Sequence, residues 1–144
     1  KYWQTVRNGD AVSLDFDMPE LAARIDFLRE QNKAKGQYGG PGWANYAATY
    51  FNDCARFAAA AQRVLRPGAR AVVVLGNSIL QGVEFRTDEI FADICCRHRL
   101  EREDIHMLRK KRTGASIIQS SVRVASATAK TTLYESAVVV RKPG

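Results

Sequence analysis

The sequence predicts an α/β fold, and three observations support this class. Apolar residues repeat at helical spacing within residues 19–32 and 44–65. An uncharged run of Ala and Val follows Pro67-Gly68, and Val138-Val139-Val140 lies near the end of the chain, as is typical of strands. We therefore expect helix, helix, strand, helix, strand and strand in that order, with helices packed on a sheet and a terminal pair of antiparallel strands.

The first predicted helix begins at Asp17-Met18-Pro19-Glu20 and ends near Asn32. Asp17 can cap the helix, Pro19 suits an early helical position, and Glu20 can reach back to the cap. The apolar stripe that this helix buries consists of Leu21, Ile25 and Leu28.

Residues 37–43 hold three glycines and one proline, and this composition predicts a loop. Tyr38 and Trp43 in this loop either stack on a base or an adenine ring, or pack the loop against its own domain. A second helix should follow from about Ala44 to Leu65, and its run of alanines at positions 58–61 allows close approach to a sheet.

The segment 63–78 is the most informative part of the chain. A helix should end at Arg66-Pro67-Gly68, and a buried strand should follow over residues 69–75. The strand opens at Gly76 onto small polar residues, and ligands of open α/β sheets bind beyond such carboxyl ends. Residues 79–86 then read as a loop.

A third helix should begin at Thr87, because Thr can cap it and Asp88 and Glu89 favour its first turn. It should end near His98, and strands should follow over residues 105–111 and 135–141. The segment between these strands, about residues 113–132, is polar and basic with little amphipathic pattern.

The chain has 144 residues, and we expect one domain with a sizeable core. No apolar run approaches the length of a membrane span and no signal peptide is visible, so we expect a cytoplasmic protein. The chain begins at Lys1 without Met, which suggests a fragment or a processed product. Spacings typical of a zinc site are absent, and we expect buried, reduced thiols at Cys54, Cys95 and Cys96.

The positive charge lies in the last third of the chain. Residues 1–96 carry 11 basic and 11 acidic side chains, so the formal net charge of +7 belongs to residues 97–144. Such a segment either binds a polyanion, most often nucleic acid, or is a solvated basic face. The densest cluster is Arg109-Lys110-Lys111-Arg112, and Ser116, Ser120, Ser121 and Arg123 follow it with further groups suited to phosphate contacts.

Residues 44–144 resemble the carboxyl-side half of class I S-adenosylmethionine-dependent methyltransferases. In that Rossmann-like fold the sheet ends with strand five, a helix, strand six, and a seventh strand inserted antiparallel. The stretch from Arg63 to Gly68 resembles the helix before strand five. Gly76-Asn77-Ser78-x-x-x-Gly82-Val83 and Thr87-Asp88 resemble the strand-five region of DNA amino-methyltransferases, which methylate cytosine N4 or adenine N6. The ending resembles that group at residues 112–123 and 135–140.

Two motifs of that group are missing from the chain. No Pro-Pro pair exists, although these enzymes hold the target amine with an Asp/Asn/Ser-Pro-Pro-Tyr/Phe motif after strand four. The glycine-rich turn after strand one is also missing, because Gly39-Gly40-Pro41-Gly42 does not follow an apolar strand. We therefore expect a partial Rossmann-like methyltransferase sheet, with the missing half on the same or another chain.

The resemblance implies DNA methylation of the restriction–modification type, with S-adenosyl-L-methionine as cofactor and DNA as partner. It places Tyr50, Phe51 and Asp53 near the adenosine, although helical spacing alone makes Tyr50 and Phe51 core residues. It places Gly76, Asn77 and Ser78 on the rim between cofactor and target, although this tripeptide is also good turn chemistry. The implied DNA contacts are Arg109, Lys110, Lys111, Arg112 and Arg123.

Three functions stay open. The first is a DNA amino-methyltransferase of which this chain is part. The second is a noncatalytic nucleic-acid-binding α/β module, or an accessory subunit that completes the active site of a partner. The third is a methyltransferase for RNA or a small molecule. The histidines, His98 and His106, receive no role.

Overall fold

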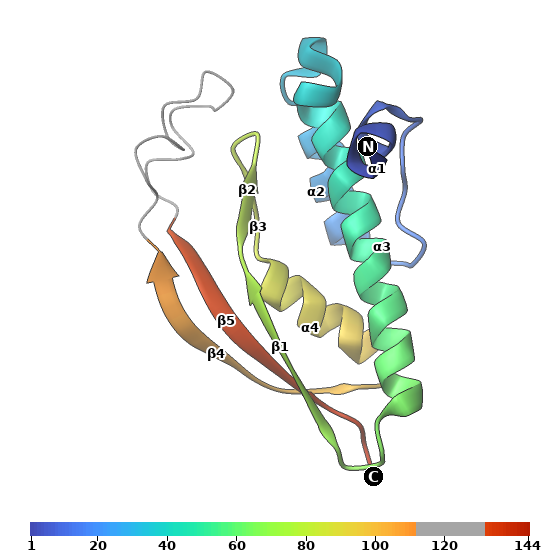
Figure 1. Ribbon diagram of the computed structural model, residues 1–144, viewed down its shortest axis with the longest axis vertical. Helices are drawn as coiled ribbons and strands as arrows, with labels where there is room; N and C mark the ends of the chain where they lie inside the picture. The colour runs from blue at the N-terminus through green and yellow to red at the C-terminus, as the bar shows by residue number, and fades with distance from the viewer. Residues whose placement is uncertain (112–131) are drawn as a thin grey trace. The chain divides into compact units, whose positions relative to one another are not determined.

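A computed structural model describes residues 1–111 and 132–144 (Figure 1). The observed elements are, in chain order, α1 (Tyr2–Asn8), α2 (Pro19–Glu30), the 3-10 helix η1 (Lys33–Tyr38), α3 (Gly40–Val64), β1 (Arg70–Gly76), β2 (Ser78–Leu80), β3 (Val83–Phe85), α4 (Thr87–Arg97), β4 (Glu101–Lys111) and β5 (Leu133–Arg141). The predicted α/β class is confirmed by these elements. The Rossmann-like methyltransferase sheet stays a prediction.

Contacts along the chain group it into two compact units. The first contains Lys1–Asp53 and Ile79–Val83, and the described part of the second contains Cys54–Ser78 with residues 84–111 and 132–144. Helix α3 begins in the first unit and ends in the second. Compact units of one chain need not be separate domains, so the single domain also stays a prediction.

Buried asparagines on α3 organise the first unit. The Asn45 amide donates to the carbonyl oxygens of Val6, Gly9 and Asp10 at 3.0–3.2 Å, and its oxygen accepts from the Val12 amide at 3.0 Å. Two helical turns later, Asn52 bonds the backbone of Ser13 and Asp15 in the same way. Together they fix the irregular segment between α1 and α2. The predicted stripe of α2 is confirmed, because Leu21, Ile25 and Leu28 are at most 3% exposed.

The predicted loop over residues 37–43 is wrong, because residues 37 and 38 end η1 and α3 begins at Gly40. The glycine at this position serves close packing: a Cβ at Gly40 would overlap the carbonyl oxygens of Leu28 and Gln31, which only glycine avoids. Pro41 fits the first helical turn, where its missing N–H needs no partner. Trp43 packs edge-on against Tyr46 within this unit. This contact agrees with the second alternative given by the sequence, that the aromatic residue packs against its own domain.

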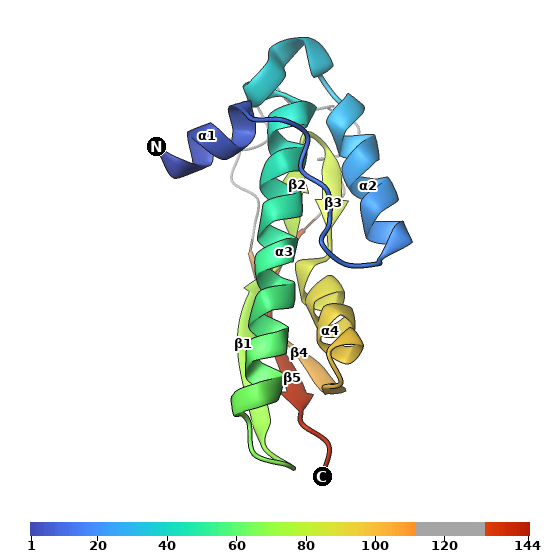
Figure 2. The same ribbon diagram turned by 90° about the vertical axis from the view of Figure 1, so that its right-hand side faces the viewer.

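The second unit is built on a three-stranded antiparallel sheet with the order β1-β5-β4. Strand β5 lies between the other two and is antiparallel to both, with Val73 opposite Val138 and Ile105 also opposite Val138. The predicted antiparallel terminal pair is therefore confirmed. Helix α4 packs on the sheet (Figures 1 and 2). Phe91 of α4 also contacts Phe57 of α3, with ring centroids 5.9 Å apart.

Strand β1 is not the buried strand that the sequence predicts. It is an edge strand of the described sheet, and alternate side chains face solvent, with Val72 62% and Val74 56% exposed. An apolar run indicates a strand but not how many neighbours cover it. The predicted loop over residues 79–86 is also wrong, because β2 and β3 form a hairpin whose turn residues, Gln81 and Gly82, both have positive φ.

Several predicted element ends need correction. Met18 rather than Asp17 occupies the N-cap of α2, Arg86 rather than Thr87 precedes α4, and neither position makes a side-chain capping bond. Helix α1 was not predicted, and β4 begins at Glu101 rather than Ile105. None of the helices among the described residues is long and apolar enough to cross a membrane.

Candidate functional site

Tyr50, Phe51 and Asp53 lie on the part of α3 that belongs to the first unit. Phe51 is 2% exposed and packs edge-on against Tyr50, with ring centroids 5.3 Å apart. This burial agrees with the core reading of Phe51 and leaves its ring no face for an adenosine. Asp53 is exposed. Gly76, Asn77 and Ser78 belong to the second unit.

Asn77 connects the end of β1 to the start of β5. Its amide donates to Glu84 Oε1 and to the Thr132 carbonyl oxygen, each at 3.0 Å, and its oxygen accepts from the Tyr134 amide at 2.9 Å. Both N–H groups of the amide are therefore used within the chain, and Asn77 is only 8% exposed. This geometry makes Asn77 a clamp between strands and leaves it no donor for a base edge.

Gly76 allows the close approach that this clamp requires. A Cβ at Gly76 would lie 2.7 Å from the carbonyl oxygen of Tyr134, closer than side chains tolerate. Ser78 opens β2 and is half-buried. The binding of S-adenosylmethionine by these six residues stays a prediction.

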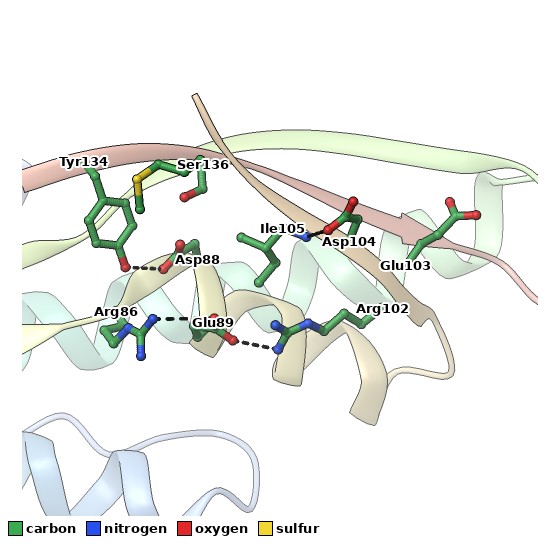
Figure 3. A pocket seen from close by; sticks show the side chains of 10 residues that line it. Arg86, Asp88, Glu89, Arg102, Glu103, Asp104, Ile105, Tyr134 and Ser136 are labelled. Carbon is green, nitrogen blue, oxygen red and sulfur yellow. Dashed lines mark hydrogen bonds and ion pairs between the residues drawn. The ribbon is translucent and has the colours of Figure 1, made fainter. Parts of the chain in front are cut away.

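A pocket of about 440 Å³ lies in the second unit, between the start of α4 and strands β4 and β5. Figure 3 shows the phenol of Tyr134 pointing to Asp88, with an O–O distance of 3.0 Å. Asp88 is 2% exposed, so the phenol satisfies a buried carboxylate. The lining residues are Arg86, Asp88, Glu89, Arg102, Glu103, Asp104, Ile105, Met107, Tyr134 and Ser136.

Glu89 holds the two cationic groups of this pocket. Its carboxylate lies 2.6 Å from Arg102 and 3.7 Å from Arg86 (Figure 3). Burial raises the pKa of Tyr134, which keeps the phenol protonated as the donor to Asp88. A hydrogen bond to Tyr134 in turn raises the pKa of Arg86. The charged groups that line this part of the pocket are therefore paired with one another.

Ser136 and Met107 complete the pocket from neighbouring positions on β5 and β4. Ser136 is 1% exposed, and its hydroxyl makes no hydrogen bond with the part of the chain that the structure describes. None of the residues predicted for a site lines this pocket. Within residues 1–111 and 132–144, no group of three or more His, Cys, Asp or Glu side chains could hold a metal ion.

The basic cluster is less uniform than its sequence suggests. Arg109 pairs with Glu135 at 2.5 Å, and this hydrogen bond raises the pKa of Arg109. Lys110 is exposed, Lys111 ends β4, and Arg112 and Arg123 lie outside the described residues. All four acidic residues of the last third have a basic partner: Glu101 with Arg141, Glu103 with Arg70, Asp104 with His106, and Glu135 with Arg109.

Sequence reasoning missed Tyr134, Ser136 and the clamp that Asn77 forms. The alternation in Tyr134-Glu135-Ser136 signals which residues share a face of β5, but the contact of Tyr134 with Asp88 joins positions 46 residues apart. Cys54 and Cys95 are buried as predicted, but Cys96 is exposed, because adjacent helical residues point in different directions.

Comparison with protein-family models found no match for this chain, and searches of curated proteins and of solved structures also found none.

Proposed function

We propose that this chain is the carboxyl-side part of an S-adenosylmethionine-dependent DNA methyltransferase that modifies an exocyclic base amine of cytosine (N4) or adenine (N6). The glycine-rich turn and the Pro-Pro motif that hold cofactor and amine are supplied by the missing half of the domain, on the same or another chain. The 144-residue chain itself contributes the edge of a Rossmann-like sheet and contacts to DNA.

One observation carries the proposal: the order β1-β5-β4, with β5 antiparallel between its neighbours and α4 preceding β4. The resemblance implies the same order for its last three strands, where the seventh is inserted between the fifth and the sixth. Consecutive strands are usually neighbours in a sheet, as β4 and β5 are here, and the feature that supports the proposal is that the last strand also pairs with β1 on its other side.

The charge distribution supports DNA as the partner. Each acidic side chain of residues 97–144 forms an ion pair with a basic side chain. The basic side chains outside these pairs include Lys110, which is exposed. Phosphate contacts of this kind hold a duplex without reading its sequence.

The alternative is a noncatalytic nucleic-acid-binding module or an accessory subunit. The observation that favours it is the engaged amide of Asn77, because the rim position then has a structural role. Both alternatives bind DNA, and only the first leads to methylated bases.

The decisive experiment measures methyl transfer by the full-length gene product. Radiolabelled S-adenosylmethionine and unmethylated DNA are incubated with that product, and the bases are identified by mass spectrometry. We expect N4-methylcytosine or N6-methyladenine. The 144-residue chain alone should bind the cofactor weakly or not at all in a calorimetric titration. DNA binding without any methylated base from the full-length product would refute the enzyme and leave the binding module.

A paired measurement tests the DNA contacts. The affinity for DNA should fall as salt rises, and replacing Lys110, Lys111 and Arg112 with Ala should make that fall less steep. The slope of log affinity against log salt should shrink in magnitude by up to about 0.9 for each phosphate that the variant no longer neutralises. Arg63→Ala combined with Arg66→Ala is the control, because these exposed arginines lie outside the cluster. If the triple variant and the control variant show the same salt dependence of DNA affinity, the basic cluster does not contact DNA.

A further inference from the structure

Four aromatic side chains of the first unit form a continuous cluster that the proposed function does not use. Trp3 of α1 lies 5.0 Å from Tyr2 and 4.8 Å from Tyr46 of α3, and Tyr46 lies 5.7 Å from Trp43, measured between ring centroids. We call Tyr2, Trp3, Trp43 and Tyr46 the aromatic cluster. Figures 1 and 2 show α1 beside the amino-terminal part of α3, which brings these residues together.

The outer rings of the aromatic cluster face solvent. Tyr2 is 62% and Trp3 is 40% exposed, whereas Trp43 and Tyr46 are half-buried. Their contacts are edge-on or tilted, with interplanar angles of 57–77°, so the rings are not stacked face to face on one another. Single exposed aromatics are common on protein surfaces, but a connected group whose outer rings are exposed is a surface on which flat ligands can stack.

Two cationic residues, Lys1 and Arg7, belong to the same helix as Tyr2 and Trp3 or directly precede it. The guanidinium of Arg7 lies 5.3 Å from the centre of the Trp43 ring, and neither Arg7 nor Lys1 forms an ion pair with any described residue. No charged residue occurs between Gly40 and Asn52, where α3 carries Trp43 and Tyr46. An anionic ligand therefore meets two cations that no acidic side chain of the described residues neutralises.

Aromatic faces beside cations match the chemistry of unpaired nucleobases on a phosphate backbone. Bases stack on the rings whatever their sequence, and the backbone is attracted by the cations. We propose that the aromatic cluster binds unpaired bases of single-stranded DNA, with Tyr2 and Trp3 as the stacking surface and Lys1 and Arg7 beside the phosphates. The inference rests on the nucleic acid partner of the proposed function, but not on methyl transfer.

The chain contains its own reporter for this site. Its only two tryptophans are Trp3 and Trp43, and both belong to the aromatic cluster. Tryptophan fluorescence of the 144-residue chain therefore reports on this cluster alone. We expect oligothymidylate to quench it, because a base stacked on Trp3 changes the environment of the indole, and heparin, a polyanion without bases, to leave it nearly unchanged.

Tyr2→Ala tests the stacking surface without removing the reporter. An exposed position tolerates the change, and the affinity for a labelled oligothymidylate, followed by anisotropy, should fall about 5- to 150-fold. Phe27→Ala is the matched control, since Phe27 is an equally exposed aromatic of the same unit, 61% exposed on α2, and its removal should leave the affinity unchanged. Trp3→Phe should retain most of the affinity, because a ring face remains.

Two results would overturn the inference. Equal quenching by heparin and oligothymidylate would mean that charge alone acts at the cluster, and an equal fall in affinity for Tyr2→Ala and Phe27→Ala would mean that the rings of Tyr2 and Trp3 do not stack with bases. If the full-length product methylates no DNA but the base-dependent quenching persists, the proposed function fails and this inference stands.

Discussion

Replacing Asn77 with Ala tests whether this residue is a clamp or a member of an active-site rim. The change removes hydrogen bonds to Glu84, to Thr132 and from Tyr134, all between 2.9 and 3.0 Å. A hydrogen bond contributes about 0.5–1.5 kcal/mol net, so three of them amount to about 1.5–4.5 kcal/mol of the free energy of unfolding. That is a large share of the stability of a small protein.

Urea unfolding of the 144-residue chain, followed by far-ultraviolet circular dichroism, measures this change in stability. Tryptophan fluorescence is unsuitable here, because both tryptophans belong to the other unit. Asn8→Ala is the control: Asn8 is exposed and makes no side-chain hydrogen bond with described residues, so its effect should stay within about 0.5 kcal/mol. If Asn77→Ala leaves the unfolding free energy unchanged but lowers single-turnover methylation by the full-length product, the clamp is wrong and Asn77 acts on a ligand.

Other changes test the remaining structure. Asn45→Ala should lower the unfolding free energy by about 2–4 kcal/mol, because it leaves several backbone groups unpaired; a fluorescence-detected effect smaller than that of Asn8→Ala would contradict this. Gly40→Ala should cost about 1–3 kcal/mol by overlap with neighbouring carbonyl oxygens, and an unchanged melting temperature would exclude that packing. A thiol reagent at neutral pH should label the exposed Cys96 quickly and Cys95 only after unfolding, as peptide mass spectrometry can show. Burial raises the pKa of Cys95 from 9.0 to about 12, so the folded state keeps a neutral thiol; stability should fall as pH rises from 9 towards 12, and a Cys95→Ala variant should lose that part of the pH dependence.

Local sequence signals predicted the elements whose pattern is repeated many times. The stripe of α2 and the apolar positions of α3 recur over several turns, and Pro67-Gly68 separates α3 from β1 without ambiguity. The terminal strand pair followed from two short β-rich segments close together in the chain. These features depend on neighbours in sequence, so the sequence alone specifies them.

The missed features depend on residues that are distant in sequence. The need for glycine at position 40 is set by the carbonyl oxygen of Leu28, and the burial of β1 depends on how many strands lie beside it. The pocket in the second unit needs Asp88 and Tyr134 to meet, although they stand 46 positions apart in the chain. Such contacts leave no local pattern, and this is why the sequence did not indicate the pocket.

The uncharged edge of β1 has a consequence for handling the isolated chain. Natural edge strands usually carry a lysine, a proline or a bulge that prevents another strand from joining, and residues 71–75 of β1 contain no charge and no proline. With Val72 and Val74 exposed on one face, this strand is a template for intermolecular β-pairing as the concentration rises. Preparations of the 144-residue chain should therefore be kept dilute. Val72→Lys places a charge on the solvent side of the strand and should reduce its intermolecular β-pairing.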